Sequence, residues 1–282
     1  MVSEIAKNNK CLLTGKKLNR KIIGYDLDSY RVEELKKGID RKSHSEIDNF
    51  QKIDYLEFTD SLEGLNNIDV FIVTVPTPIN DKKEPDLSFI REASRTIGNL
   101  INSDNTTKDN QIIIYESTVY PGVTEDICVP LIEKFSNKKF NSDSYYNSFY
   151  CGYSPERINP GDSENTIDKI PKVTSGSNDK VAYWIDSFYA SFIKAGTYKS
   201  KSIKVAEAAK VIENTQRDIN IALVNELAIL FKKLNLNTKD VLNTAATKWN
   251  FHNYKPGLVG GHCMCLFYTS DAADEISGVV VG

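Results

Sequence analysis

Two residues of the segment KVAEAAKVIENTQRDINIALVNELAIL have the types and the spacing of a ligand-binding pair. Lys210 and Asn214 stand four residues apart, so in a helix they lie on one face, in a row with Glu207 and Arg217. If this face lines a cleft, the ammonium and the amide present donors to one small, oxygen-rich ligand. A solvated helix face has the same pattern, and the row by itself does not distinguish the two interpretations.

A second group is a thiol that follows glycines in KWNFHNYKPGLVGGHC. Gly257 and Gly260 allow the backbone to approach a ligand closely and to adopt positive φ. Cys263 is a candidate nucleophile, provided that a cation such as Lys210 or Lys255 lowers its pKa. The alternative is a buried structural cysteine.

The element that positions the lysine and the asparagine is predicted to be one long helix from Ser202 to Leu234. This segment has no Pro or Gly and is rich in Ala, Glu, Lys and Leu, which lose little entropy in a helix. Its apolar residues recur at helical steps, and they are Val205, Ala209, Ile212, Ile219, Leu223, Leu227 and Leu230. At about 1.5 Å per residue the helix would measure roughly 50 Å, which favours a connection between two halves of a protein or between two subunits.

The chain before this helix alternates strands with helices. RKIIGYDLD predicts a short strand that ends in an acidic residue, and the helix that follows ends at Gly38. Asp26 fits the acidic residue that accepts hydrogen bonds from an adenosine ribose in dinucleotide-binding sheets, and Arg31 would lie over the adenine. Asp26 can equally well cap the following helix, although Asp28 is the better candidate for that cap.

Two further segments, IDVFIVTVPTPIN and QIIIYESTVY, predict buried parallel strands that end in polar turns. Thr77 ends the first, while Ser117 and Thr118 end the second, which is followed by a helix with Pro121 in its first turn. Such alternation predicts a doubly wound parallel sheet with ligands at the carboxyl ends of its strands. No GxGxxG turn precedes Lys21, so either the cofactor site is built differently or the start of the domain is lacking.

Length and composition bound the class of protein. With 282 residues, 40% of them hydrophobic, the chain is long enough for about two globular domains. A net charge of −3 argues against a nucleic-acid or membrane-surface protein, and no stretch predicts a signal peptide or a membrane span. Five scattered cysteines indicate reduced thiols in the cytoplasm, and the sequence around His262 offers too few ligands for a metal such as zinc.

Taken together, these segments resemble the UDP-glucose/GDP-mannose dehydrogenase family. The matching stretches, in the family's order between residues 21 and 263, are IGYDLDSYRVEELKKGID, FIVTVPTPI with PDL, ESTVYPGVTED, SPERINPGD, KVAEAAKVIENTQRDINIALVNELA and YKPGLVGGHC. SPERINPGD and ENTQRDINIALVNELA look most like the branch that acts on UDP-N-acetylhexosamines. The resemblance therefore implies an NAD-dependent dehydrogenase that oxidises the C6 alcohol of a UDP-sugar to a uronic acid for polysaccharide precursor synthesis.

The resemblance also implies roles for individual residues. Cys263 would form a thiohemiacetal and then a thioester, while Lys210 and Asn214 stabilise the alkoxide and the oxyanion. Thr118 and Glu156 would hold the water used in proton transfer and hydrolysis. The cofactor-binding residues implied are Asp26, Arg31, Thr77, Thr118 and Glu156. The substrate-binding residues implied are Glu156, Arg157, Asn159, Lys210, Asn214, Arg217, Tyr254, Gly257 and Gly260, and no metal is implied.

The expected fold is α/β, with an incomplete Rossmann-type doubly wound parallel sheet followed by a long central helix and a small helical domain. We expect an NAD-binding domain at 1–198 without its first strand and glycine loop, and a helical dimerisation and substrate domain at 199–263. The tail 264–282 lacks the family's Cys-x-x-x-Asp-Pro pattern and is expected to be non-native. The resemblance thus implies a fragment that is truncated at both ends.

Two other functions remain open. β-Hydroxyacid and 6-phosphogluconate dehydrogenases share the sheet, the long helix and a Lys-x-x-x-Asn pair, but they transfer one hydride without a covalent intermediate, so Cys263 distinguishes them. A non-catalytic protein would use the long helix only to dimerise. For the family function, the expected partners are a UDP-sugar and a second copy of the chain joined through the long helix.

Overall fold

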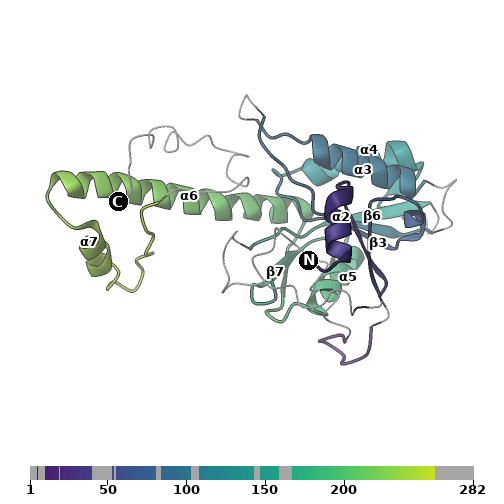
Figure 1. Ribbon diagram of the computed structural model, residues 1–282, viewed down its shortest axis with the longest axis horizontal. Coiled ribbons are helices and arrows are strands. Elements are labelled where there is room, and N and C mark those ends of the chain that lie inside the picture. The colour runs from purple at the N-terminus through teal and green to yellow at the C-terminus, as the bar shows by residue number, and fades with distance from the viewer. Residues whose placement is uncertain are drawn as a thin grey trace. The chain divides into compact units, whose positions relative to one another are not determined.

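The computed structural model describes residues 5, 10–18, 20–39, 53, 55–80, 84–102, 108–142, 147–158 and 167–257 (Figure 1). The chain forms two compact units. One consists of Met1–Pro76 with Ser88–Glu207, and the other consists of Thr77–Leu87 with Ala208–Gly282. Among the described residues, the first unit contains both helices and sheets, whereas the second unit contains helices and no sheet.

The first strand and helix form as predicted. β1 (Ile22–Tyr25) pairs in parallel with β2 (Leu56–Thr59), a strand that the sequence had not revealed. Helix α2 (Ser29–Lys36) begins at Asp28, whose carboxylate accepts a hydrogen bond from a first-turn N–H at 3.1 Å. After the helix, Gly38 adopts a φ of 77°, which glycine reaches without steric cost. The predicted cap and the predicted end are therefore both confirmed.

The central sheet of the first unit has four parallel strands in the order β3-β4-β6-β5. These strands are β3 (Val70–Val73), β4 (Gln111–Tyr115), β5 (Lys139–Phe140) and β6 (Ser148–Tyr153). Ile113 and Ile114 of β4 are fully buried, as expected for a parallel strand covered on both faces. The expected parallel sheet is confirmed, and β3 ends at Val73, before the Pro-Thr-Pro turn at which the strand was predicted to break.

Helices α3 (Ser88–Leu100) and α4 (Val129–Ser136) pack side by side against the sheet (Figure 1). They approach so closely that a Cβ on Gly98 would lie 2.9 Å from the Cβ of Phe135. A π-helical turn, η3 (Val123–Cys128), precedes α4. The prediction that Pro121 lies in the first turn of this helix is wrong, because the helical turn starts two residues later.

A third group of elements, the α5 layer, completes the first unit. β7 (Lys172–Thr174) pairs in parallel with β8 (Thr197–Lys199), and α5 (Asp179–Ala190) packs against both strands and against β6. β8 and the two-residue β5 are strands that the sequence had not revealed. Ile114 of β4 forms one buried apolar cluster with residues of this layer, which include Ile167, Val181, Ile185, Tyr189, Phe192 and Ile193. A short 3₁₀ turn, η2 (Leu65–Asn67), leads into β3.

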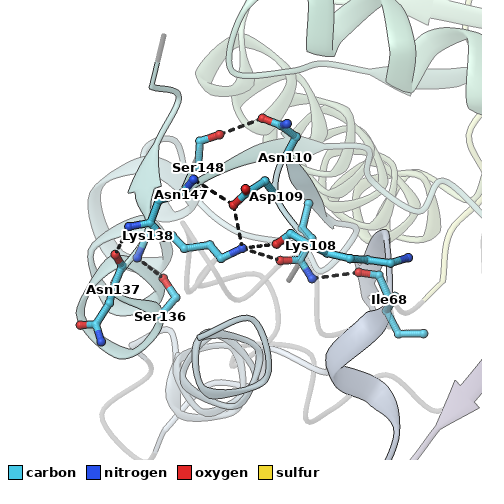
Figure 2. A network of polar contacts seen from close by, with 10 residues as sticks. Ile68, Lys108, Asp109, Asn110, Ser136, Asn137, Lys138, Asn147 and Ser148 are labelled. Carbon is cyan, nitrogen blue, oxygen red and sulfur yellow. Dashed lines mark hydrogen bonds and ion pairs between the residues drawn. The ribbon is translucent and has the colours of Figure 1, made fainter. Parts of the chain in front are cut away.

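The amino ends of the sheet strands are tied together by Lys138, whose side chain is 1% exposed. Its ammonium donates to the carbonyl oxygen of Lys108 and to Gln111 Oε1 at 3.2 Å, and it lies 3.4 Å from Asp109 Oδ1 (Figure 2). Gln111 in turn donates to the carbonyl of Ile68, just before β3. This network joins the segments that enter β3, β4 and β5.

The long helix α6 (Ile203–Lys233) is continuous over 31 residues, as predicted, and α7 (Thr238–Ala245) follows it. The buried residues of this helix include both apolar and polar side chains, and several of its large apolar residues are exposed. Its exposed apolar residues are Val205, Ile212, Ile219, Leu223, Ile229 and Leu230, and its buried polar residues are Glu207, Lys210, Asn214 and Asp218. The interpretation of the polar row as a solvated face is therefore wrong. Among the helices described, none has an apolar stretch long enough to cross a bilayer.

Candidate functional site

In the first unit the carboxyl ends of β3, β4 and β6 meet at one edge of the sheet. Ser117 Oγ donates to the carbonyl of Val75 at 2.6 Å, which ties the loop after β4 to the loop after β3. The N–H of Glu156 contacts the carbonyl of Glu116 at 3.4 Å, which ties the loop after β6 to the loop after β4. Two of the predicted site residues, Thr118 and Glu156, therefore lie on neighbouring loops at the edge where a parallel sheet binds ligands.

The loop after β6 is closed by the side chains of its own residues. Glu156 Oε1 accepts hydrogen bonds from the N–H groups of Arg157 at 2.7 Å and Ile158 at 3.0 Å. The guanidinium of Arg157 donates to the carbonyl of Pro171 at 3.0 Å. Both predicted residues are thus held by backbone contacts before any ligand binds, which reduces the entropy lost on binding. Asn159 lies outside the described residues.

A buried polar network that the sequence had not indicated supports these two loops from below. Lys172 Nζ lies 3.0 Å from Glu116 Oε2 and 3.2 Å from the carbonyl oxygen of Pro155. Tyr189 donates its hydroxyl to the other carboxylate oxygen, Glu116 Oε1, at 2.5 Å. Burial raises the pKa of Tyr189 well above its usual value, and the negative charge of Glu116 adds to the rise. We refer to Glu116, Lys172 and Tyr189 as the carboxyl-end network.

Glu207, in the polar row of α6, has a structural role in the first unit. Its fully buried carboxylate accepts hydrogen bonds from the N–H groups of Gly122 at 2.6 Å and Thr124 at 3.0 Å. These N–H groups open η3, where Gly122 adopts a φ of 101°. Loss of solvation raises the pKa of Glu207 above its ordinary value, although the hydrogen bonds oppose this rise. Because the carboxylate caps η3, the helical turn begins after Pro121 rather than at it.

The predicted cofactor residues at the end of β1 are paired with each other. Asp26 Oδ1 accepts a hydrogen bond from the N–H of Asp28 at 3.0 Å, and Asp26 Oδ2 lies 3.4 Å from Arg31 Nε. Asp28 supplies the helix cap, as predicted, so Asp26 is not needed for it. The side chain of Asp26 is 43% exposed and keeps room for acceptor contacts to a ribose. Arg31 contacts this carboxylate.

In the second unit the pair on α6 is buried rather than solvated. Lys210 is 6% exposed and Asn214 is 8% exposed, while Arg217 is half-buried. No described residue lies within hydrogen-bonding distance of Asn214 Nδ2. A buried amide N–H₂ without an acceptor is costly, so it favours a site for an oxygen-bearing ligand. Thr77, the first residue of the short segment of this unit, is also buried.

The start of the glycine-rich loop is held by a residue that sequence reasoning missed. Asn225 of α6 donates to the carbonyl of Gly257 and accepts from its N–H, both at 2.9 Å. Gly257 does not use the positive φ that glycine allows, and a Cβ there would meet nothing within 4 Å in the described part of the chain. The amide clamp already fixes this backbone. Tyr254 is half-buried and Lys255 is exposed.

Two of the most specific predictions, Gly260 and Cys263, lie outside the described residues. Three other cysteines, Cys11, Cys128 and Cys151, are buried free thiols. Burial raises the pKa of Cys128 to about 11, which keeps it protonated and unreactive at neutral pH. In the described part of the chain, no three His, Cys, Asp or Glu side chains are grouped as metal ligands.

A parallel α/β unit with an acidic residue after β1 and polar loops after β3, β4 and β6 is typical of dinucleotide-binding proteins. Residues 10–193 match the NAD binding domain of the UDP-glucose/GDP-mannose dehydrogenase family, and residues 204–266 match its central domain. The chain belongs to this family.

Relatives with known names are similar over most of this chain. It is 51% identical over 264 residues to UDP-N-acetyl-D-glucosamine 6-dehydrogenase of Pseudomonas aeruginosa, covering 93% of this chain and 60% of that protein. It is 50% identical to the protein of the same name from Salmonella typhi, covering 87% of this chain and 55% of that protein. The structure of UDP-D-ManNAc dehydrogenase from Pyrococcus horikoshii matches with a TM-score of 0.79 and 29% identity, over 93% of this chain and 58% of that one. The chain thus spans somewhat more than half the length of these proteins.

Proposed function

We propose that this chain is the NAD-binding and central part of a dehydrogenase that oxidises the C6 alcohol of a UDP-N-acetylhexosamine to the uronic acid. The substrate class is supported by the 51% identity to a UDP-N-acetyl-D-glucosamine 6-dehydrogenase. The structural observation that carries the proposal is the buried pair on α6, where Asn214 Nδ2 has no acceptor among the described residues. An oxygen of the substrate would supply that acceptor. A cytoplasmic location remains a prediction from the sequence.

The residues at the end of β1 fit the dinucleotide expected for the family. The half-exposed Asp26 carboxylate stands at a strand end and offers acceptors to ribose hydroxyls, while Arg31 holds it in place. Thr77, Thr118 and Glu156 are the remaining proposed cofactor contacts. When bound, NAD would accept one hydride in each of two successive oxidations of the same carbon.

The chain's own residues would then carry out the remaining chemistry. Lys210 and Asn214 would stabilise the alkoxide of the alcohol and the later oxyanion with a charge and an N–H donor. The Cys263 thiol would add to the intermediate aldehyde to give a thiohemiacetal, whose oxidation leaves a thioester. Thr118 and Glu156 would hold the water that hydrolyses the thioester, releasing the uronate and the free thiol.

The remaining predicted residues are proposed to bind the sugar nucleotide. Arg157 and Arg217 would contact its phosphates or sugar as cations, and Tyr254 would pack against it. Asn159, Gly257 and Gly260 complete the proposed set. Within the described residues, Arg157 is already held by the carbonyl of Pro171, so this contact needs little rearrangement.

The test is a count of NADH formed per sugar consumed. The chain is incubated with NAD and, separately, with UDP-N-acetylglucosamine, UDP-N-acetylgalactosamine and UDP-glucose. Two NADH per sugar and a uronate product are expected with one of the N-acetylhexosamines. Cys263→Ala should abolish uronate formation, whereas Cys265→Ala, the matched control two residues along the chain, should retain it.

Other outcomes would favour the alternatives. One NADH per substrate, with turnover unaffected by Cys263→Ala, indicates a single-hydride dehydrogenase without a covalent intermediate. Absence of calorimetric binding to both NAD and the UDP-sugars indicates a non-catalytic protein. Asp26→Asn should weaken NAD binding, and Glu57→Gln on the neighbouring strand β2 serves as a control that should not.

We also propose that α6 joins two copies of the chain. Its apolar residues Ile212, Ile219 and Leu223 are each more than half exposed along one face, an arrangement that marks protein interfaces. Ile219→Lys should shift the sedimentation coefficient from dimer to monomer. Phe89→Lys, which changes a similarly exposed apolar residue on α3, should leave the dimer intact; a monomeric parent protein would refute the proposal.

A further inference from the structure

The carboxyl-end network joins four segments that are far apart in the sequence. Glu116 directly follows β4, Lys172 opens β7, and Tyr189 lies near the end of α5. The side chains of Glu116 and Lys172 are 2% and 3% exposed, and Tyr189 is fully buried. The fourth segment is the loop after β6, which contributes the carbonyl of Pro155.

Each polar group of this network has a partner. Tyr189 occupies one oxygen of the Glu116 carboxylate and Lys172 occupies the other. The ammonium of Lys172 also satisfies the carbonyl of Pro155, which otherwise would be buried beyond the ladder of β6. Removal of the lysine would leave the carbonyl of Pro155 without a donor and the carboxylate of Glu116 with only the Tyr189 hydroxyl. The network therefore strengthens the backbone contact between Glu156 and Glu116 that already ties the two loops.

The positions of these contacts in the chain suggest their purpose. Glu116 is two residues before Thr118, and Pro155 is the residue before Glu156. Lys172 therefore contacts the loops after β4 and β6 immediately next to Thr118 and Glu156, the residues proposed to hold the reactive water. The loop after β6 is also tied to β7, because Ser154 Oγ donates to the carbonyl of Val173 at 2.7 Å.

We infer that Lys172, Glu116 and Tyr189 are positioning residues that set the distance between Thr118 and Glu156 in the proposed oxidation. The inference rests on the proposed function for its chemistry, but its structural part stands on the network alone. The network acts through the two loops, and its three residues are not among those proposed to contact the cofactor or the sugar. Because misplacement of a reacting group by about 1 Å costs as much as 100-fold in rate, a loosened junction should lower turnover more than binding.

The experiment compares variants that lose a buried lysine at opposite ends of the sheet. The double variant Glu116→Gln/Lys172→Met removes both charges together, so no unpaired ion is left buried and the protein is expected to fold. Lys138→Met removes the equally buried lysine at the amino end and serves as the control. Tyr189→Phe removes only the hydroxyl contact to Glu116 and should give an intermediate result.

The first readout does not depend on activity. Amide hydrogen exchange should become at least about tenfold faster at residues 154–158 in the double variant, while peptides from β4 keep the parental rate. A merely structural role would instead accelerate exchange throughout the first unit. Lys138→Met should leave residues 154–158 unchanged. Parental exchange at 154–158 in the double variant would overturn the inference.

The second readout separates kcat from KM in the NADH assay. The double variant should lose at least about tenfold in kcat, while the KM values for NAD and the UDP-sugar stay within about twofold of the parent. Parental kcat in this variant would also overturn the inference. If the parent itself forms no NADH, the proposed function fails, and the exchange comparison still decides whether the network orders the two loops.

Discussion

The two ends of the four-stranded sheet are each cross-linked by one buried lysine, and the two lysines have different partners. At the amino end, Lys138 donates mainly to neutral oxygens, namely the carbonyl oxygen of Lys108 and the side-chain oxygen of Gln111 (Figure 2). Its carboxylate partner, Asp109, is 28% exposed and lies 3.4 Å away. At the carboxyl end, Lys172 contacts a carboxylate that is as buried as the lysine itself, at 3.0 Å.

The difference shows that a buried lysine can join chain segments with or without a buried carboxylate as its partner. A buried ammonium has three donors that need hydrogen-bond acceptors. The acceptor oxygens come from separate segments, so the lysine joins these segments at each end of the sheet. At the amino end it fastens only the entrances to the strands. At the carboxyl end it joins loops that carry candidate site residues, and the buried ion pair with Glu116 makes that junction more sensitive to the loss of one partner.

The largest expected effect is on the carboxyl-end network. Lys172→Met should lower the free energy of unfolding by about 3–5 kcal/mol, because it leaves the buried carboxylate of Glu116 without its cation. Urea unfolding followed by circular dichroism measures the loss. Adding Glu116→Gln should recover most of it, since the pair is then neutral. A single variant as stable as the parent would contradict the assigned partnership.

The matched change at the amino end should cost less. Lys138→Met is expected to lower the free energy of unfolding by about 2 kcal/mol, the usual cost of leaving buried acceptors unsatisfied. Asp109 remains partly solvated and keeps its contact with the N–H of Asn147, so no ion is stranded. The same urea titration applies. A loss equal to that of Lys172→Met would show that the two lysines do not differ as described.

Removal of one hydroxyl from each end tests the comparison with smaller changes. Tyr189→Phe should cost about 1.5 kcal/mol, because its hydroxyl donates to a charged group. Ser148→Ala, at the amino end, should cost about 1 kcal/mol, because its hydroxyl donates to the neutral amide oxygen of Asn110 at 2.8 Å. Both are measured as shifts in urea midpoint at constant m-value. The reverse order would contradict the assignment of Glu116 as an ionised partner.

The smallest expected effect is a dependence on pH. Burial lowers the pKa of Lys138 below its ordinary value of 10.5, although Asp109 opposes the change. At pH values between the lowered pKa and 10.5, Lys138 is still protonated in the unfolded chain but has lost its proton in the native protein. The free energy of unfolding therefore rises with pH in that window. The parent should therefore gain stability relative to Lys138→Met as the pH approaches 10.5. If the parent instead lost stability relative to this variant over this pH range, the pKa of Lys138 would be raised rather than lowered.

Much of the fold was predictable because the relevant signals are local. The Asp28 cap, the end at Gly38 and the length of α6 depend on neighbouring residues, and all three predictions hold. Strands β2, β5 and β8 were missed because they are short and carry little periodicity. The candidate site was predictable only in part, since motif positions do not reveal supporting contacts such as the clamp between Asn225 and Gly257.

The sequence alone was enough to predict the helices, the Asp28 cap and the alternation of strands and helices. Each of these depends on residues that are close together in the sequence. Long-range packing was required for the rest. The polarity of α6 is periodic, but periodicity does not say which residues meet other parts of the chain, and here Glu207, Lys210 and Asn214 are among the buried ones. Glu116 and Lys172 are 56 residues apart, and their pairing exists only because β4 and β7 deliver both side chains to one end of the sheet.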